Sequence, residues 1–153
     1  MSHPRLHVPH IRPAEVPTLV VALVVAAVVE TGLRLTTLPR LARALGTPLA
    51  VDGRLAYGER EHSVGLPEWA VSDMNTARRV LRRWPFADTC LRQALVCGWL
   101  LRRLEPRLQL GVARIDGEVR AHAWLVVNGA VVDPRHAVSA YQPLATLRAG
   151  GAR

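Results

Sequence analysis

Two dipeptides near the end of the chain, Asp116-Gly117 and Asn128-Gly129, constrain the fold more than any other feature. Each is typical of the two-residue loop of a β-hairpin, and each separates segments whose residues favour strands. Before Pro106 the apolar residues recur with the period of a helix instead. Helices followed by a short antiparallel sheet predict an α+β domain.

The chain has 153 residues, half of them hydrophobic, which suits a single domain with one core. Helices are expected at residues 14–30, in a short segment that stops near Gly46, and at 67–83. A further helix should begin after Asp88 or Thr89 as N-cap and run to about Leu104. The expected parts are a flexible head at 1–13, a helical part at 14–83 with a loop near 47–66, the last helix and the sheet at 84–140, and a tail at 141–153.

Charge and hydropathy indicate whether the chain binds nucleic acid or a membrane. All 20 basic residues are arginine and the formal net charge is +8, but the arginines are scattered and aromatic residues are few, so nucleic-acid binding is not expected. The most apolar run, residues 19–29, is shorter than the roughly 20 residues of a membrane span. We expect a buried helix there, with docking on a membrane surface left open. No secretory signal is recognisable, and we expect a cytoplasmic protein.

The only two cysteines, Cys90 and Cys97, lie in one predicted helix. Seven residues place their Cα atoms roughly 10 Å apart, whereas a disulfide needs less than about 7 Å. Cys97 lies among apolar residues in the middle of the helix and is expected in the core. Cys90 lies in the first turn, where the helix dipole favours a thiolate and unpaired N–H groups can hold an oxyanion. A structural role for Cys90 stays open unless the fold also supplies a base.

The hairpin closed at residues 128–129 offers that base. Its register pairs Val127 with Ala130, Leu125 with Val132, and Trp124 with Asp133. Because side chains alternate along a strand, His122, Trp124 and Asp133 share one face. His122 and Asp133 are then diagonal neighbours, roughly 7–8 Å apart at Cα, so the carboxylate can accept a hydrogen bond from the imidazole. The opposite face should point to the core with its apolar residues Ala121, Ala123, Leu125 and Val127.

Together these residues fit a Cys-His-Asp triad. Cys90 would attack a carbonyl, His122 would take the thiol proton and later protonate the leaving amine, and Asp133 would orient the imidazole. Structural roles remain open, since His122 can be an ordinary sheet residue and Asp133 a turn residue before Pro134. Weaker candidates are His62 and His136. Three further histidines, His3, His7 and His10, lie in the head, where no rigid frame would hold a metal ion. No metal or other cofactor is therefore expected.

The segments CLRQALVCGWLLRR at 90–103, LGVA at 110–113 and AHAWLVVNGAVVDP at 121–134 resemble the leader peptidases of lasso-peptide biosynthesis, the B-two family of transglutaminase-like cysteine proteases. The resemblance covers roughly residues 75–140. It implies a papain/transglutaminase-like core at 84–140, with a catalytic helix packed on the sheet. The residues that match the family's triad are Cys90, His122 and Asp133. One departure is Val126, where members often carry an acidic residue.

The resemblance implies that the enzyme removes the leader from a ribosomally made precursor peptide through an acyl-enzyme. It also implies a separate leader-recognition protein of winged-helix type, for which this chain has no domain, and the lasso cyclase that closes the ring. Trp84 and Trp124 are candidates for substrate binding, with core packing as the alternative. A transglutaminase-like acyltransferase or amidase with the same triad stays open, as does a non-catalytic peptide-binding scaffold.

Overall fold

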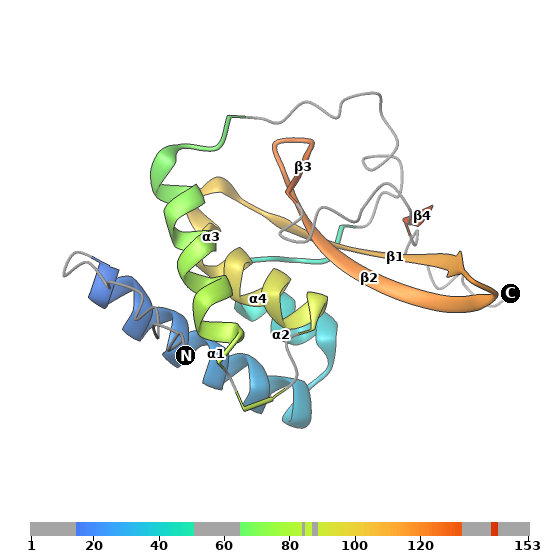
Figure 1. Cartoon of the computed structure of the whole chain (residues 1–153), viewed down its shortest axis with the longest axis horizontal. Helices are drawn as coiled ribbons and strands as arrows, with labels where there is room; N and C mark the ends of the chain where they lie inside the picture. The colour runs from blue at the N-terminus through green and yellow to red at the C-terminus, as the bar shows by residue number, and fades with distance from the viewer. Residues whose placement is uncertain (1–14, 51–64, 84, 87–88, 133–141, 144–153) are drawn as a thin grey trace, which may run out of the picture.

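The computed structural model describes residues 15–50, 65–83, 85–86, 89–132 and 142–143. Helices α1, α3 and α4 pack against one another, and α4 also packs on the sheet (Figure 1). This confirms the predicted α+β class, with helices first and an antiparallel sheet after them. The elements in chain order are α1 (Val16–Leu35), α2 (Leu38–Ala44), α3 (Glu68–Leu81), α4 (Cys90–Leu100), the 3₁₀ turn η3 (Arg102–Leu104), β1 (Arg107–Ile115), β2 (Glu118–Val127), β3 (Ala130–Val132) and β4 (Gln142–Pro143).

Two helices end at different places from those predicted. Helix α1 continues five residues beyond the expected end at Glu30, because Gly32 approaches Leu41 of α2 closely and the chain leaves the helix only at Thr36. Helix α4 ends at Leu100 instead of Leu104, and the next residues tighten into a 3₁₀ turn. Proline at position 106 disfavours helical backbone in the residue before it, so the chain cannot continue as an α-helix to that point.

Helix α1 is buried along one face only, which corrects the prediction of a buried helix at residues 19–29. Its inner residues are at most 5% exposed: Ala22, Val25, Ala26 and Val29. Its outer residues are 44–57% exposed: Val20, Leu23, Val24 and Val28. By length and composition alone α1 could cross a membrane, since the mean hydropathy of its most apolar 18-residue stretch is 2.2. In the fold, 28% of that stretch is buried. The helix is therefore both a core element and a large apolar surface.

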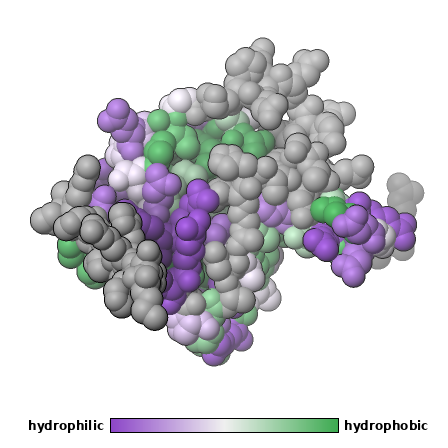
Figure 2. All heavy atoms as spheres, in the orientation of Figure 1, coloured by the Kyte–Doolittle hydropathy of each residue, from purple (hydrophilic) through white to green (hydrophobic). Residues whose placement is uncertain are grey.

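The sheet has the order β3-β2-β1-β4, with antiparallel neighbours throughout. Both predicted hairpin loops are confirmed, since Asp116, Gly117, Asn128 and Gly129 all have positive φ, as a type I′ turn requires. The far half of the β1–β2 hairpin projects beyond the helices (Figure 1), and Figure 2 shows hydrophilic residues around its tip. Ala121 lies on this projecting part and is exposed, contrary to its predicted place in the core.

The predicted loop near 47–66 begins with residues that pair with the sheet. Leu49 forms a parallel bridge with Leu108 of β1. The Ala50 N–H donates to the Leu108 carbonyl at 2.8 Å, and the Leu108 N–H donates to the Pro48 carbonyl at 3.0 Å. Residues 47–50 thus form no helix or strand, as predicted for a loop, apart from this isolated bridge at Leu49. Residues 51–64 lie outside the described part of the chain.

Candidate active site

Cys90 is the first residue of α4 and is partly buried. The preceding Thr89 has an extended backbone, and its Oγ1 accepts a hydrogen bond from the Arg92 N–H at 3.4 Å. Thr89 is thus the N-cap, one of the two residues predicted for it; the other, Asp88, lies outside the described residues. The N–H groups of Cys90 and Leu91 are among those for which a helix has no internal acceptor. They belong to the same helical turn as the Cys90 thiol.

A buried ion pair holds this first turn against α1. Glu30, only 7% exposed, accepts from Arg92 Nε at 2.8 Å and also pairs with Arg34 at 2.8 Å. The hydrogen bond from Arg92 lowers the pKa of the Glu30 carboxyl, and this outweighs the burial that would raise it. The sequence analysis missed this role, because Glu30 marked only the end of the apolar run. A lone acidic residue in an apolar helix, four residues before an arginine, was the available signal.

We expect Glu30→Gln to lower stability at pH 7, because the amide cannot neutralise two guanidinium groups. The carboxyl's pKa is lowered on folding, so its contribution is present above its ordinary value of 4.5 and is lost as pH falls through the folded value. The variant should therefore lose less stability on acidification than the parent protein. Urea unfolding at pH 7 and pH 4 measures both effects. Glu118→Gln is the control, because the Glu118 side chain is 75% exposed and its 3.6 Å pair with Arg120 lies at the surface.

His122 lies in β2 and is buried, with 5% of its surface exposed. Its imidazole stacks on the Trp124 indole, with ring centroids 5.9 Å apart and an interplanar angle of 28°. Across β1 its pairing partner is Gly111, which has no side chain to occupy the space beside the imidazole. Sequence reasoning missed this pairing, since it considered only the β2–β3 hairpin.

Trp124 is fully buried, and its pairing partner across β1 is the buried Gln109. Among the residues that the structure describes, none is a hydrogen-bond partner of the indole Nε1. Trp124 therefore supports His122 from within the fold, which favours the packing role over contact with substrate. The other proposed substrate-binding residue, Trp84, lies outside the described residues, as do His62 and His136.

The predicted register of the second hairpin is confirmed as far as the structure describes it. Val127 pairs with Ala130 and Leu125 pairs with Val132. One more step in the same register sets position 133 opposite Trp124, on the face of His122. Asp133 itself lies outside the described residues, so its place beside His122 stays a prediction.

Helix α4, which carries Cys90, is in contact with strand β2, which carries His122. The core side of β2 is formed by Ala123, Leu125 and Val127, and His122 alternates to the other side. In the described residues β3 pairs with residues 125–127 of β2. Figure 1 shows the N-terminal end of α4 on this side of β2, away from β1. We therefore expect the thiol and the imidazole to meet at this edge of β2.

No group of three histidine, cysteine, aspartate or glutamate residues that could hold a metal ion occurs in the described part of the chain. The histidines of the head lie outside that part. The groups that the described residues bring to the site are the Cys90 thiol, the His122 imidazole and the N–H groups at the start of α4.

A family model with the description "Transglutaminase-like superfamily" matches residues 20–146. The match covers more than four fifths of the chain and includes α1 from Val20 onward, α4 and all four strands of the sheet. It also includes all three residues predicted for the triad. No curated protein and no solved structure matches the chain.

Proposed function

The chain belongs to the transglutaminase-like superfamily, and from this we propose that it is a cysteine endopeptidase that removes the leader from a lasso-type precursor peptide. The superfamily carries cysteine-based protease or acyl-transfer chemistry. The packing of α4 on a short antiparallel sheet agrees with a papain-like core. The observation that carries the proposal is the placement of Cys90 at the start of a helix that packs on the strand of the buried His122.

In the proposed reaction the Cys90 Sγ attacks the carbonyl carbon of the scissile bond, and His122 takes the thiol proton. The N–H groups of Cys90 and Leu91 donate to the oxyanion that forms. When the C–N bond breaks, His122 gives its proton to the leaving amine, and the leader stays on Cys90 as a thioester. A water molecule, deprotonated by His122, then releases the leader with a new carboxylate. Asp133 orients the imidazole through both steps.

The proposed partners are the precursor peptide, a separate leader-recognition protein of winged-helix type, and the lasso cyclase that uses the freed amine. A separate recognition protein raises the effective concentration of the scissile bond at Cys90, because it holds the leader beside the enzyme. We propose a cytoplasmic setting, where a precursor fresh from the ribosome and its cyclase are both present. Each partner is expected to be encoded beside this gene.

A direct test is to incubate the chain with the neighbouring precursor and recognition protein in ¹⁸O-labelled water, with an added primary amine. Peptide-bond hydrolysis places ¹⁸O in the new carboxylate of the leader, and we expect this product. An acyltransferase would instead join the leader to the added amine, because an amine replaces water in the second step. A non-catalytic scaffold would leave the precursor whole. Mass spectrometry of the leader separates these three results.

A further inference from the structure

The outer face of α1 forms a continuous apolar stripe on the surface of the protein. Its members recur every three or four residues and are all exposed: Val16, Val20, Leu23, Val24, Ala27, Val28, Thr31 and Leu35. We call this set the α1 stripe. Its length is about 28 Å at the rise of a helix, and the first exposed charge beside it is that of Arg34. Soluble proteins rarely leave a contiguous apolar patch of this kind uncovered, so the stripe marks an interface.

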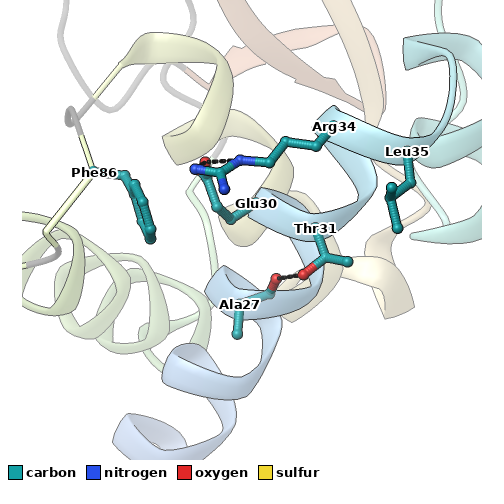
Figure 3. A pocket seen from close by; sticks show the side chains of 6 residues that line it. All are labelled: Ala27, Glu30, Thr31, Arg34, Leu35 and Phe86. Atoms are coloured by element: carbon teal, nitrogen blue, oxygen red, sulfur yellow. Dashed lines mark hydrogen bonds and ion pairs between the residues drawn. The ribbon is translucent and has the colours of Figure 1, made fainter.

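The two ends of the α1 stripe differ in shape. The C-terminal end borders a hollow of about 320 Å³, lined by three stripe residues together with Glu30, Arg34 and Phe86 (Figure 3). The Arg34 guanidinium lies 4.9 Å from the centre of the Phe86 ring. At the N-terminal end the valines project instead, with Val16 46% and Val20 54% exposed. One end therefore offers a hole, and the other offers side chains that can fill a hole.

We propose that a second copy of this chain covers the α1 stripe, with the two α1 helices antiparallel about a twofold axis near Val24. Such a pairing is isologous, so each copy both fills a hollow and has its own filled. Val16 and Val20 of one copy enter the hollow of the other. This assignment does not depend on the proposed peptidase activity.

Charge decides the direction of the pairing. In the antiparallel arrangement Arg34 of one copy, which pairs with Glu30 at 2.8 Å, lies beside Glu15 of the other, which pairs with Arg79 at 2.9 Å. The two ion pairs can then join into one network of alternating charge. A parallel arrangement would set Arg34 against Arg34, and would leave both hollows facing each other unfilled. The helix dipoles also oppose each other favourably only when the helices are antiparallel.

The stripe suits a second copy better than a membrane surface. Helices that lie in a membrane interface combine aromatic residues on the apolar face with basic residues on the opposite face. The α1 stripe contains no aromatic residue, and the opposite face of α1 is buried in the fold. The contact between two α1 stripes is small, because it is about 28 Å long and one helix, about 10 Å, wide. Contacts of this size support weak complexes, so monomer and dimer should exchange at about micromolar concentrations.

Sedimentation equilibrium of the full chain, at about 1 to 100 µM, tests the proposal. We expect the mass to rise from that of a 16.8 kDa monomer toward twice that value. Val24→Glu should stay monomeric over the whole range, because it buries two carboxylates beside the axis. Val119→Glu is the matched control, since Val119 is 75% exposed at the hairpin tip and should dimerise like the parent. Circular dichroism melting verifies that each variant is folded.

Crosslinking tests the direction of the helices. In a Cys90→Ser background, Val24→Cys should form a disulfide dimer under mild oxidation, because the axis brings the two residues together. Val16→Cys should not, since its two copies would be roughly 25 Å apart and a disulfide needs less than about 7 Å. A monomer at every concentration would overturn the proposal, and so would equal crosslinking at both positions. Binding of the parent, but not of Val24→Glu, to phosphatidylglycerol vesicles by a monomer would assign the stripe to a membrane instead.

Discussion

Cys90→Ala should lower the rate of precursor cleavage by about 10⁴-fold or more, because the change removes the atom that forms the acyl-enzyme. The fold should survive, since Cys90 is only partly buried at the end of α4. Cleavage of the precursor at saturating recognition protein gives the rate, and thermal melting gives the stability of the variant.

The matched control is Cys97→Ala in the same helix. Cys97 is fully buried, so its truncation should cost about 1 kcal/mol of stability while the rate per folded molecule stays close to that of the parent. Rapid cleavage by Cys90→Ala would remove Cys90 from the mechanism. Loss of cleavage by folded Cys97→Ala would contradict the purely structural role of Cys97.

Asp133→Asn should keep the fold and lower the rate by about 10- to 10³-fold. The amide can donate where the imidazole N–H needs an acceptor, which favours the wrong tautomer of His122. The loss should be smaller than in a serine protease, because a thiol depends less on its base. His122→Ala should cost more than Asp133→Asn, since it removes the proton carrier itself.

Asp116→Asn is the control for this second prediction. Asp116 has a positive φ in the first hairpin loop, a conformation that asparagine adopts equally well, so the rate should not change. Inserting one residue in the loop at 128–129 should shift the register, turn Asp133 to the other face and lower the rate with it. Normal turnover of Asp133→Asn would leave Asp133 as a turn residue, and the orienting group would have to be another.

Local features of the chain were predictable from its sequence. Asn128-Gly129 sets both the turn and the register of its hairpin, because few other residues tolerate two successive positive φ values. The start of α4 was also predictable, because threonine is a preferred N-cap residue and its hydroxyl accepts a hydrogen bond from an N–H of the first turn. The burial of Cys97 followed from its neighbours in the same helix.

Contacts between distant segments were not predictable in this way. The pairing of Glu30 with Arg92 joins residues 62 positions apart, and the bridge from Leu49 to Leu108 depends on how the chain returns to the edge of β1. The apolar sequence of α1 is equally compatible with burial on every side. Which face stays exposed is decided only when α3 and α4 pack against it.

The most direct measurement of the central claim is to quench the cleavage reaction with acid within its first turnover and map the protein by mass spectrometry. The account predicts a thioester between the leader and Cys90, present in the parent protein and absent in Cys90→Ala. The adduct should form more slowly in His122→Ala, because the thiol then lacks its base. A leader adduct on any other residue, or complete first-turnover cleavage with the Cys90 peptide unmodified throughout, would contradict the proposed mechanism.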